Sequence, residues 1–365
     1  MSTQRERFDV IILAAGLGTR MKSGKAKVLH ELGGSPLIAH VCRAAKQLTP
    51  RTIYVVVGHQ ANDVEAAVRE CAPDANLEFV EQGAQRGTGD AVMAAQDNLK
   101  SSREPLLVLS GDVPLVKAET LQRLLEQHQS SGAACSIVSI RLENPTGYGR
   151  IVRDETGKFL KIVEQKDASE AEREIREVNS GFYCFDPPSL FSALEKIEPA
   201  NKQGEYYLTD VPALIANSGK KIQVYSHPDA RELSGINTRA ELAEFENLLR
   251  RRTIRTLMLE GGVTFIDPSH AYISADARIG RDCIIHQDVM IEGGSVLGEG
   301  CVVRSGTRIT NSRLGPNVTV KDHCVIVDSD IEANCSVGPF AHLRQNARLE
   351  EGSAVGNFVE LKKSR

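Results

Sequence analysis

The chain has 365 residues, enough for two domains of ordinary size, and its 44 Lys and Arg against 48 Asp and Glu give a net charge of −4. Hydrophobic residues make up 41% and charged residues 25%. This balance argues against a nucleic-acid surface, which is normally basic and clustered. No stretch has the length of a membrane span, the N-terminal apolar run is too short for a signal peptide, and the eight cysteines form no CxxC pair. We therefore expect a cytoplasmic protein with no nucleic-acid or membrane partner and no zinc or redox motif.

Short apolar runs alternate with helical patterns through the first half of the chain. In chain order, the predicted strands include Val10–Ala14, Ile53–Val57, Leu106–Leu109 and Ser136–Ile140. The predicted helices include Leu37–Gln47, Asp63–Cys71, Asp90–Leu99 and Ala118–Gln129. Apolar strands that alternate with helices indicate an α/β fold with a mainly parallel sheet. Ligands of such sheets bind at the carboxyl ends of the strands.

A Gly-rich loop, Leu13–Met21, directly follows the first predicted strand. Glycines there let the backbone approach a phosphate and expose its N–H groups. A dinucleotide-binding loop would need a third glycine where Met21 stands, and no Gly-Lys-Ser/Thr follows to make a Walker A loop. The loop carries its own cation, Arg20, with Lys27 close behind, which suits the triphosphate of a nucleotide. The alternative is a tight strand-to-helix turn with surface charges.

Between the two halves, Thr238–Glu260 has apolar residues near helical spacing and a basic run, Arg250–Arg252. We predict a linker helix over residues 238–260 with a solvated basic face.

An aliphatic residue recurs at every sixth position from Ile273 onward, with two steps shortened to five residues. The series is Ile273, Ile279, Ile285, Ile291, Leu297, Val303, Ile309, Leu314, Val320, Ile326, Ile331, Val337, Leu343, Leu349, Val355 and Leu361. This period is the hexapeptide signature of a parallel β-helix, with aliphatic side chains inside and small ones at the corners, and we predict it over residues 261–365. Four cysteines occupy small-residue positions and are predicted to fill the core: Cys283, Cys301, Cys324 and Cys335.

Several further motifs occur in one order along the chain. They are Lys27–His30, Gly87–Gly89, Ser110–Leu115, Pro145–Arg150, Ile162–Glu164, Asn179–Gly181, Gly204–Asp210 and Gly356–Glu360. Together with the loop and the hexapeptide half, the whole chain resembles the bacterial bifunctional N-acetylglucosamine-1-phosphate uridyltransferase/glucosamine-1-phosphate acetyltransferase family. The resemblance implies a Rossmann-like nucleotidyltransferase domain over residues 1–237 and a left-handed β-helix that is an incomplete acetyltransferase domain.

The reaction that this resemblance implies is uridylyl transfer from UTP to N-acetylglucosamine 1-phosphate. It gives UDP-N-acetylglucosamine, for peptidoglycan and lipopolysaccharide synthesis, and pyrophosphate. Arg20 and Lys27 would be the catalytic cations, and Mg²⁺ would be held by Asp112 and Asn237. Taken alone, Asp112 could instead cap a turn and Asn237 could cap a helix. A proline is usual where Ala26 stands, so Lys25 competes with Lys27 as the phosphate ligand, but the Val-Leu-His that follows favours Lys27.

The resemblance also implies the residues that bind the substrates. For the nucleotide and the phosphates they are Leu13, Ala14, Ala15, Gly16, Lys27, Gln82, Gly87, Thr88, Ser110, Gly111 and Asp112. Gln82 and the pair Gly87 and Thr88 match positions that read uracil, and an amide suits its mixed donor and acceptor edge. Gly149, Glu164 and Asn179 match contacts to the N-acetylated sugar. Without the family, Gln82 and Glu164 would be interpreted as ordinary polar surface residues.

In the hexapeptide half, Arg344 and Lys362 match residues that hold the sugar phosphate for acetyl transfer. The sequence ends at Arg365, before the family's catalytic histidine and acetyl-CoA pocket, so we expect no acetyl transfer by this chain; acetyl-CoA would be a partner only of a longer one. The resemblance further implies a homotrimer. Two alternatives stay open: a nucleotidyltransferase for another sugar or base with a regulatory β-helix, and a non-catalytic scaffold that senses nucleotide sugars.

Overall fold

A computed structural model describes residues 7–364 of the chain. It divides into two compact units, with the division between Arg239 and Ala240. None of the helices within residues 7–364 has the length and apolar run that crossing a bilayer would need.

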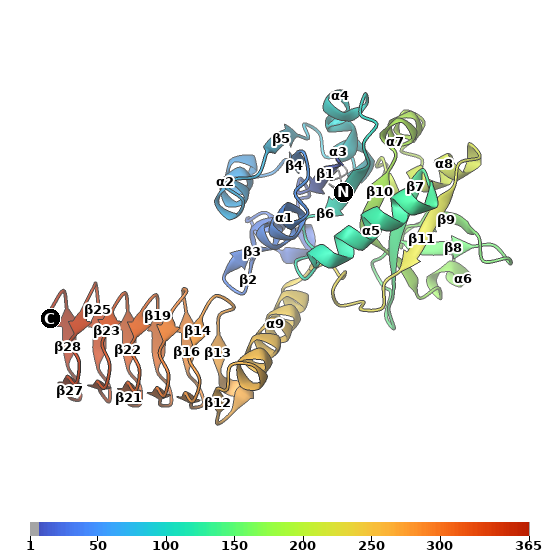
Figure 1. Ribbon diagram of the computed structural model, residues 1–365. Coiled ribbons are helices and arrows are strands. Elements are labelled where there is room, and N and C mark those ends of the chain that lie inside the picture. Colours follow the sequence, from blue (N-terminus) through green and yellow to red (C-terminus); the bar gives the residue numbers. More distant parts are fainter. Residues whose placement is uncertain (1–6, 365) are drawn as a thin grey trace, which may run out of the picture. The chain divides into compact units, whose positions relative to one another are not determined.

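The first unit is built on a mixed nine-stranded sheet with the order β11-β7-β10-β6-β1-β4-β5, and β8 and β9 extend it beside β10 (Figure 1). The strands are β1 (Asp9–Leu13), β4 (Ile53–Val57), β5 (Leu77–Glu81), β6 (Leu106–Ser110), β7 (Cys135–Arg141), β8 (Arg150–Arg153), β9 (Phe159–Val163), β10 (Glu177–Phe185) and β11 (Ile222–Ser226). Strands β6, β1, β4 and β5 run parallel, as do β7 and β11, whereas β10 is antiparallel to both β6 and β7. A separate hairpin joins β2 (Glu31–Leu32) and β3 (Ser35–Pro36).

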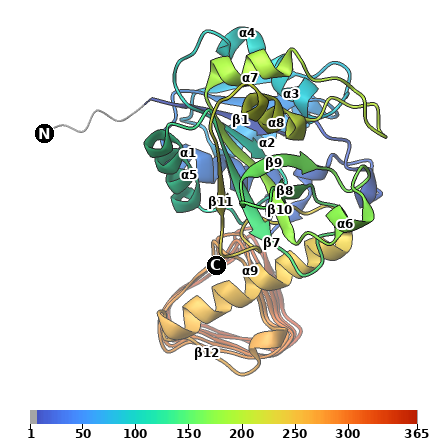
Figure 2. The ribbon, with the colours of Figure 1, turned by 90° about the vertical axis from the view of Figure 1, so that its right-hand side faces the viewer.

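Helices cover both faces of this sheet, because successive strand side chains point to opposite faces and both sets are apolar. The helices are α1 (Leu37–Gln47), α2 (Ala61–Cys71), α3 (Thr88–Ala94), α4 (Gln96–Leu99), α5 (Ala118–Ser131), α6 (Glu170–Arg173), α7 (Pro187–Leu194) and α8 (Val211–Asn217). Val10 and Ile12 of β1 lie in one core cluster with α1, α2 and α5. Ile11 lies in the other, with α3, α4, α7 and α8 (Figure 2).

The prediction of a single helix over Asp90–Leu99 was wrong in one respect, because two helices, α3 and α4, occupy this region. Ala95 separates them with φ −91° and ψ 5°. Its N–H bonds to the carbonyl of Val92, three residues back, so the helical ladder tightens into a turn there. Ala95 is buried in the core. Its packing accounts for this break between the helices, which the sequence does not mark with a proline or a glycine.

The second unit begins with the long helix α9 (Arg239–Leu259), which buries Phe245 and Ile254. Its basic run is only partly solvated as predicted. Arg251 and Arg252 are exposed, but the guanidinium of Arg250 lies 4.6 Å from the ring centre of Tyr272 and donates to the carbonyl of Ala271 at 3.4 Å. A guanidinium packs well on an aromatic face, which explains the difference.

Three parallel sheets of very short strands make up the rest of this unit, and they form the predicted parallel β-helix. The first has β12 (Thr264–Phe265), β15 (Ile284–Ile285), β18 (Val302–Val303), β21 (Thr319–Val320), β24 (Ser336–Val337) and β27 (Ala354–Val355). The second has β13 (Tyr272–Ile273), β16 (Met290–Glu292), β19 (Arg308–Thr310), β22 (Val325–Val327), β25 (His342–Arg344) and β28 (Glu360–Lys362). The third has β14 (Arg278–Ile279), β17 (Val296–Leu297), β20 (Arg313–Leu314), β23 (Asp330–Ile331) and β26 (Arg348–Leu349). Figure 1 shows the coils stacked from β12 to β28, and Figure 2 shows their three-sided outline.

The aliphatic residues of the hexads fill the interior of these coils. All of those predicted are buried except Leu361, which is partly buried. The four cysteines predicted as core residues are also buried, and each is a free thiol. Cys283 and Cys301 each donate to a carbonyl on the next coil, at 3.1 Å. Their burial and backbone partners confirm that these cysteines fill the core.

Two neighbouring isoleucines in β15 test this arrangement. Ile285 is fully buried, whereas Ile284 is 36% exposed. Ile285→Ala is expected to destabilise the β-helix by about 2–5 kcal/mol, because it leaves a cavity in a closely packed core. Ile284→Ala, the matched control, is expected to cost less than about 1 kcal/mol. Urea unfolding of both variants measures the difference, and equal losses would contradict the inside–outside assignment.

Candidate active site

The Gly-rich loop after β1 folds back on itself so that its two cations meet. Gly18 adopts φ +61° and precedes the short 3₁₀ helix η1 (Thr19–Met21), whose Met21 is buried. A Cβ on Gly18 would lie 2.4 Å from Cβ of Lys27. A glycine is therefore required here for two reasons: the backbone is left-handed, and η2 (Lys27–Leu29) approaches closely. As a result, Arg20 and Lys27 are brought to the same place.

Arg20, Lys27, Asp112 and Asn237 form one polar cluster. The Lys27 ammonium donates to Asp112 Oδ2, in a partly buried ion pair, and to Asn237 Oδ1 at 3.1 Å. Arg20 Nη2 donates to the same Asn237 oxygen at 2.8 Å. All four predicted residues of the catalytic and metal-binding sets thus converge, although Asn237 lies 210 residues beyond Lys27 in the sequence. Lys25 instead pairs with the exposed Glu31 at 3.6 Å, so the geometry favours Lys27 as the phosphate ligand.

Asp112 follows β6 at the carboxyl edge of the sheet, as the strand pattern predicts. The N–H of Gly111 donates to the carbonyl of Leu13 at 3.0 Å, and a Cβ on Gly111 would lie 2.8 Å from that oxygen. The carbonyl of Asp112 in turn accepts from the N–H of Ile236 at 2.9 Å, next to Asn237. Backbone hydrogen bonds therefore join the three chain segments that carry the cluster.

The donor set at this point fits Mg²⁺. One ammonium, that of Lys27, reaches both Asp112 Oδ2 and Asn237 Oδ1, so both oxygens lie within reach of a single cation. No group of three or more His, Cys, Asp or Glu within residues 7–364 could hold a metal ion. Mg²⁺ is usually bound by one or two protein oxygens together with phosphate oxygens and water, which matches a carboxylate and an amide beside a phosphate loop.

A cavity of about 270 Å³ opens beside the cluster, within the first unit. Predicted site residues that line it are Leu13, Arg20, Thr88, Ser110, Asp112, Gly149, Glu164, Asn179 and Asn237. On the side of β8, β9 and β10, a Cβ on Gly149 would lie 2.9 Å from Ile162 and 3.3 Å from Glu164 Oε1. Asn179 Nδ2 donates to the hydroxyl of Tyr183 at 2.6 Å, which fixes the amide inside the cavity. These contacts give this end of the cavity a fixed polar lining.

Glu164, like Asp112, is a carboxylate that lines the cavity. Burial raises its pKa above the ordinary 4.5, the hydroxyl of Thr209 donates to Oε1 at 3.0 Å and opposes the rise, and the charges of Asp210 and Asp167 add to it. Folding therefore takes up a proton at Glu164 between the ordinary and the raised pKa. The stabilisation that comes from this proton uptake is complete below pH 4.5. It is lost as the pH rises through the raised pKa of Glu164.

Glu164→Gln is consequently expected to raise Tm at pH 7, because the neutral amide removes this cost while still accepting from Thr209. The gain should disappear below pH 4.5, where the carboxyl is neutral in both states. Scanning fluorimetry across pH measures the effect, and Glu170→Gln on the exposed surface of α6 serves as the control. A gain in Tm that persists unchanged below pH 4.5 would contradict it.

The residues predicted to read uracil lie beside the cavity and are tied to one another. The amide of the buried Gln82 donates to the carbonyl of Gly87 at 3.1 Å and to Asp90 at 2.8 Å. Gly87 adopts φ +110°, and a Cβ there would lie 2.5 Å from the carbonyl of Tyr206. Thr88 Oγ accepts from the N–H of Leu208 at 3.1 Å. Of the three predicted residues, only Thr88 lines the cavity itself.

The rest of the predicted loop lies at the rim of the parallel strands. Ala14 and Ala15 are buried, Gly16 is exposed, and the carbonyl of Ala15 accepts from Gln85 at 2.6 Å.

In the second unit, Arg344 and Lys362 are register partners on the adjacent strands β25 and β28. Arg344 also donates to Glu360 at 2.5 Å. The structure thus places this predicted phosphate-binding pair side by side on one sheet of the β-helix.

The cavity is also lined by residues that the sequence analysis did not name as site residues, among them Tyr148, Tyr183 and Thr209. Tyr148 and Thr209 lie within motifs that it recognised, and the Tyr148 hydroxyl accepts from the N–H of Gly235 at 3.2 Å. Tyr183 lies in β10 as one apolar residue among others, and no pattern distinguishes it. Its contact with Asn179 is visible only once β10 is folded.

Comparison with known proteins identifies the family. Residues 10–202 match the MobA-like NTP transferase domain, and residues 265–365 match the GMPPB C-terminal domain. The bifunctional protein GlmU of Geobacillus sp. (strain WCH70) is 45% identical over 354 residues, which cover 97% of this chain and 76% of the relative. The chain belongs to the GlmU family. The bifunctional protein GlmU of Syntrophomonas wolfei is 43% identical over 358 residues, 98% of this chain and 78% of its own length.

Membership of the GlmU family confirms the resemblance drawn from the motifs. The chain is a nucleotidyltransferase of this family, which excludes the purely sensing scaffold. The roles of individual residues stay predictions.

Proposed function

We propose that the first unit transfers a uridylyl group from UTP to N-acetylglucosamine 1-phosphate. A phosphate oxygen of the sugar phosphate attacks the α-phosphorus, the bond from that phosphorus to the bridging oxygen of the β-phosphate breaks, and pyrophosphate leaves. The observation that carries the proposal is the convergence of Arg20, Lys27, Asp112 and Asn237 in one cluster, beside a cavity that Glu164 and Asn179 also line. Family membership supports the same reaction class.

The chain's own groups position the reactants and neutralise charge. Arg20 and Lys27 stabilise the negative charge that moves onto the leaving pyrophosphate. Asp112 and Asn237 would hold Mg²⁺, which would supply Lewis-acid stabilisation of phosphate charge. Such cations are effective here because a partly buried site weakens the screening by water.

Separate groups of residues recognise the two substrates in this proposal. Gln82, Gly87 and Thr88 read the base, and the buried bond from Gln82 to Asp90 holds the amide in one orientation. Gly149, Glu164 and Asn179 bind the sugar, because a carboxylate accepts from hydroxyls and an amide can both donate and accept.

Pyrophosphate release tests the proposal. UTP, dTTP and GTP would each be combined with N-acetylglucosamine 1-phosphate or glucose 1-phosphate in the presence of Mg²⁺. The expected result is preferential turnover of UTP with N-acetylglucosamine 1-phosphate. Preferential turnover of another pair would favour the alternative, a nucleotidyltransferase for a different sugar or base with a regulatory β-helix. A cytoplasmic location and a homotrimer remain proposals alongside this one, and light scattering tests the trimer.

A further inference from the structure

The segment that carries Asn237 has no regular secondary structure. Residues 234–237 follow a turn and precede α9, so no ladder of backbone hydrogen bonds fixes them. Leu233 and Ile236 are fully buried, and Ile236 donates to the carbonyl of Asp112 at 2.9 Å. Asn237 must nevertheless stay in one place relative to Asp112 for both oxygens to reach one cation. Something else has to anchor the start of the segment.

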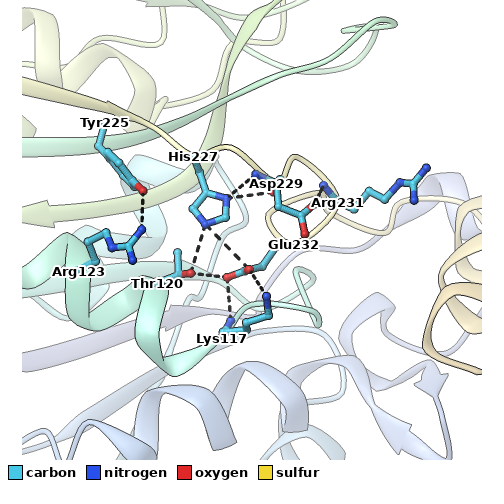
Figure 3. A network of polar contacts seen from close by, with 8 residues as sticks. All are labelled: Lys117, Thr120, Arg123, Tyr225, His227, Asp229, Arg231 and Glu232. Carbon is cyan, nitrogen blue, oxygen red and sulfur yellow. Dashed lines mark hydrogen bonds and ion pairs between the residues drawn. The ribbon is translucent and has the colours of Figure 1, made fainter. Parts of the chain in front are cut away.

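Glu232 provides that anchor (Figure 3). It is a carboxylate only 4% exposed, at the start of the segment, and it points at the first turn of α5. Oε1 accepts from the N–H of Lys117 at 3.2 Å and from the hydroxyl of Thr120, and Oε2 pairs with the Lys117 ammonium at 2.9 Å. Burial alone would raise the pKa of Glu232, but the bonds from Thr120 and Lys117 hold it below the ordinary value. The carboxylate is thus kept ionised at the N-terminus of a 14-residue helix, where negative charge is favoured.

His227 completes the network from the end of β11. Its Nε2 lies 3.3 Å from Thr120 Oγ and 4.0 Å from Glu232 Oε2. Its Nδ1 accepts from the N–H of Asp229 at 3.2 Å, which closes the turn that leads to Glu232. Figure 3 shows these side chains converging between the first turn of α5 and the segment after β11. Two stretches of chain more than 100 residues apart, 117–120 and 227–232, are therefore locked together.

Both locked stretches lead directly to the cluster. The stretch at Lys117 is the continuation of the chain from Asp112, and the stretch at Glu232 runs on to Asn237. The bond from Ile236 to Asp112 joins the same two chain segments a second time, next to the oxygens. With Glu232 at one end and this bond at the other, the spacing between Asp112 and Asn237 is fixed.

We propose that Glu232 is a positioning residue, which sets the placement of Asn237 against Asp112 by clamping the Asn237 segment to the N-terminus of α5. It touches neither substrate nor metal. Its catalytic consequence rests on the proposed function, whereas the clamping itself does not.

Hydrogen–deuterium exchange and metal dependence together test this role in the full chain. Glu232→Ala removes the acceptors, Glu232→Gln keeps a neutral acceptor in the same place, and Asp9→Ala is the control. Asp9 is 1% exposed and is bound by Arg51, but it starts β1, at the end of that strand away from the loop. Both alanine variants thus lose a buried carboxylate that has a cationic partner. Of these two carboxylates, Glu232 is the one proposed to hold the Asn237 segment.

In Glu232→Ala, the Ile236 amide is expected to exchange about 10-fold faster, while in Asp9→Ala it keeps its wild-type rate. Mn²⁺ binding with UTP, followed by electron paramagnetic resonance, and the Mg²⁺ requirement of turnover are expected to weaken by about 10-fold in Glu232→Ala. Glu232→Gln is expected to recover most of both losses.

Unchanged exchange at Ile236 in Glu232→Ala would overturn the proposal. So would equal losses of exchange protection and metal binding in Asp9→Ala at a similar fall in Tm, because Glu232 would then act through general stability alone. If the wild-type chain turned over no substrate pair, the proposed function would fail. The exchange and Mn²⁺ measurements would still decide whether Glu232 positions Asn237, so the two failures are distinguishable.

Discussion

Asp112→Ala is expected to lower uridylyl transfer by about 1,000-fold, equivalent to about 4 kcal/mol of transition-state stabilisation. The substitution removes the only carboxylate of the cluster, and with it both a proposed metal ligand and the partner of Lys27. The fold is expected to survive, because the bond that joins Asp112 to Ile236 uses the backbone carbonyl, which alanine retains. The cost in stability should be about 1 kcal/mol, because Lys27 loses one partly buried partner but still donates to Asn237 Oδ1.

Pyrophosphate release over a range of Mg²⁺ concentrations, together with Tm, measures both effects. Asp74→Ala is the control, because Asp74 has a side chain 90% exposed and pairs with Lys46 only at 3.6 Å. It should keep wild-type turnover. Near-normal turnover in Asp112→Ala would rule out the assignment of Asp112 to the metal, and partial recovery at higher Mg²⁺ would support it.

The parallel part of the sheet and the β-helix were predictable because their signals are local. A strand buried on both faces is a continuous apolar run, as in β4 and β6, and each coil of the β-helix repeats the same aliphatic position. Sixteen such positions were predicted, and burial confirms the pattern.

The antiparallel strand β10 was not predicted, and its sequence shows why. The strand Glu177–Phe185 is interrupted by Asn179, Ser180 and Gly181, and its register against β7 shifts between Asn179 and Phe182. Gly181 takes φ +81°, and a Cβ there would lie 2.5 Å from Ser110 Oγ. These polar and left-handed residues line the cavity, so the same residues that serve the site obscure the strand pattern.

The sequence predicted which residue types make up the site better than it predicted how they contact one another. A cationic Gly-rich loop and an aspartate at the end of a strand follow from sequence and strand geometry. The pairing of Lys27 with Asn237 does not, because it depends on an irregular segment held by Glu232 and buried side chains, and only the family resemblance pointed to it. The sequence already favoured Lys27 over Lys25, and the contact of Lys27 with Asp112 agrees with that preference.

These two lysines make the sharpest test of the loop. Lys27→Met is expected to lower kcat/KM by about 100-fold or more, because it removes a fixed positive charge where negative charge develops on the leaving phosphate. Methionine keeps the length and apolar stem of the side chain, so Gly18 and η2 should pack as before. Asn237 Oδ1 keeps Arg20 as a donor in this variant, which argues against local unfolding.

Lys25→Met is the matched control, since it removes the same charge two residues away. The Lys25 side chain is 45% exposed and pairs with the exposed Glu31 at 3.6 Å. A surface ion pair of this kind contributes little, so turnover should stay within about 2-fold of wild type. Steady-state kinetics with both substrates varied, at fixed Mg²⁺, compares the two variants. If Lys25→Met had the larger effect, the proline that is usual at Ala26 would matter more than the geometry, and the phosphate ligand would be Lys25. If both variants were unimpaired, neither lysine would take part in transfer, and Arg20 would be left as the one proposed catalytic cation.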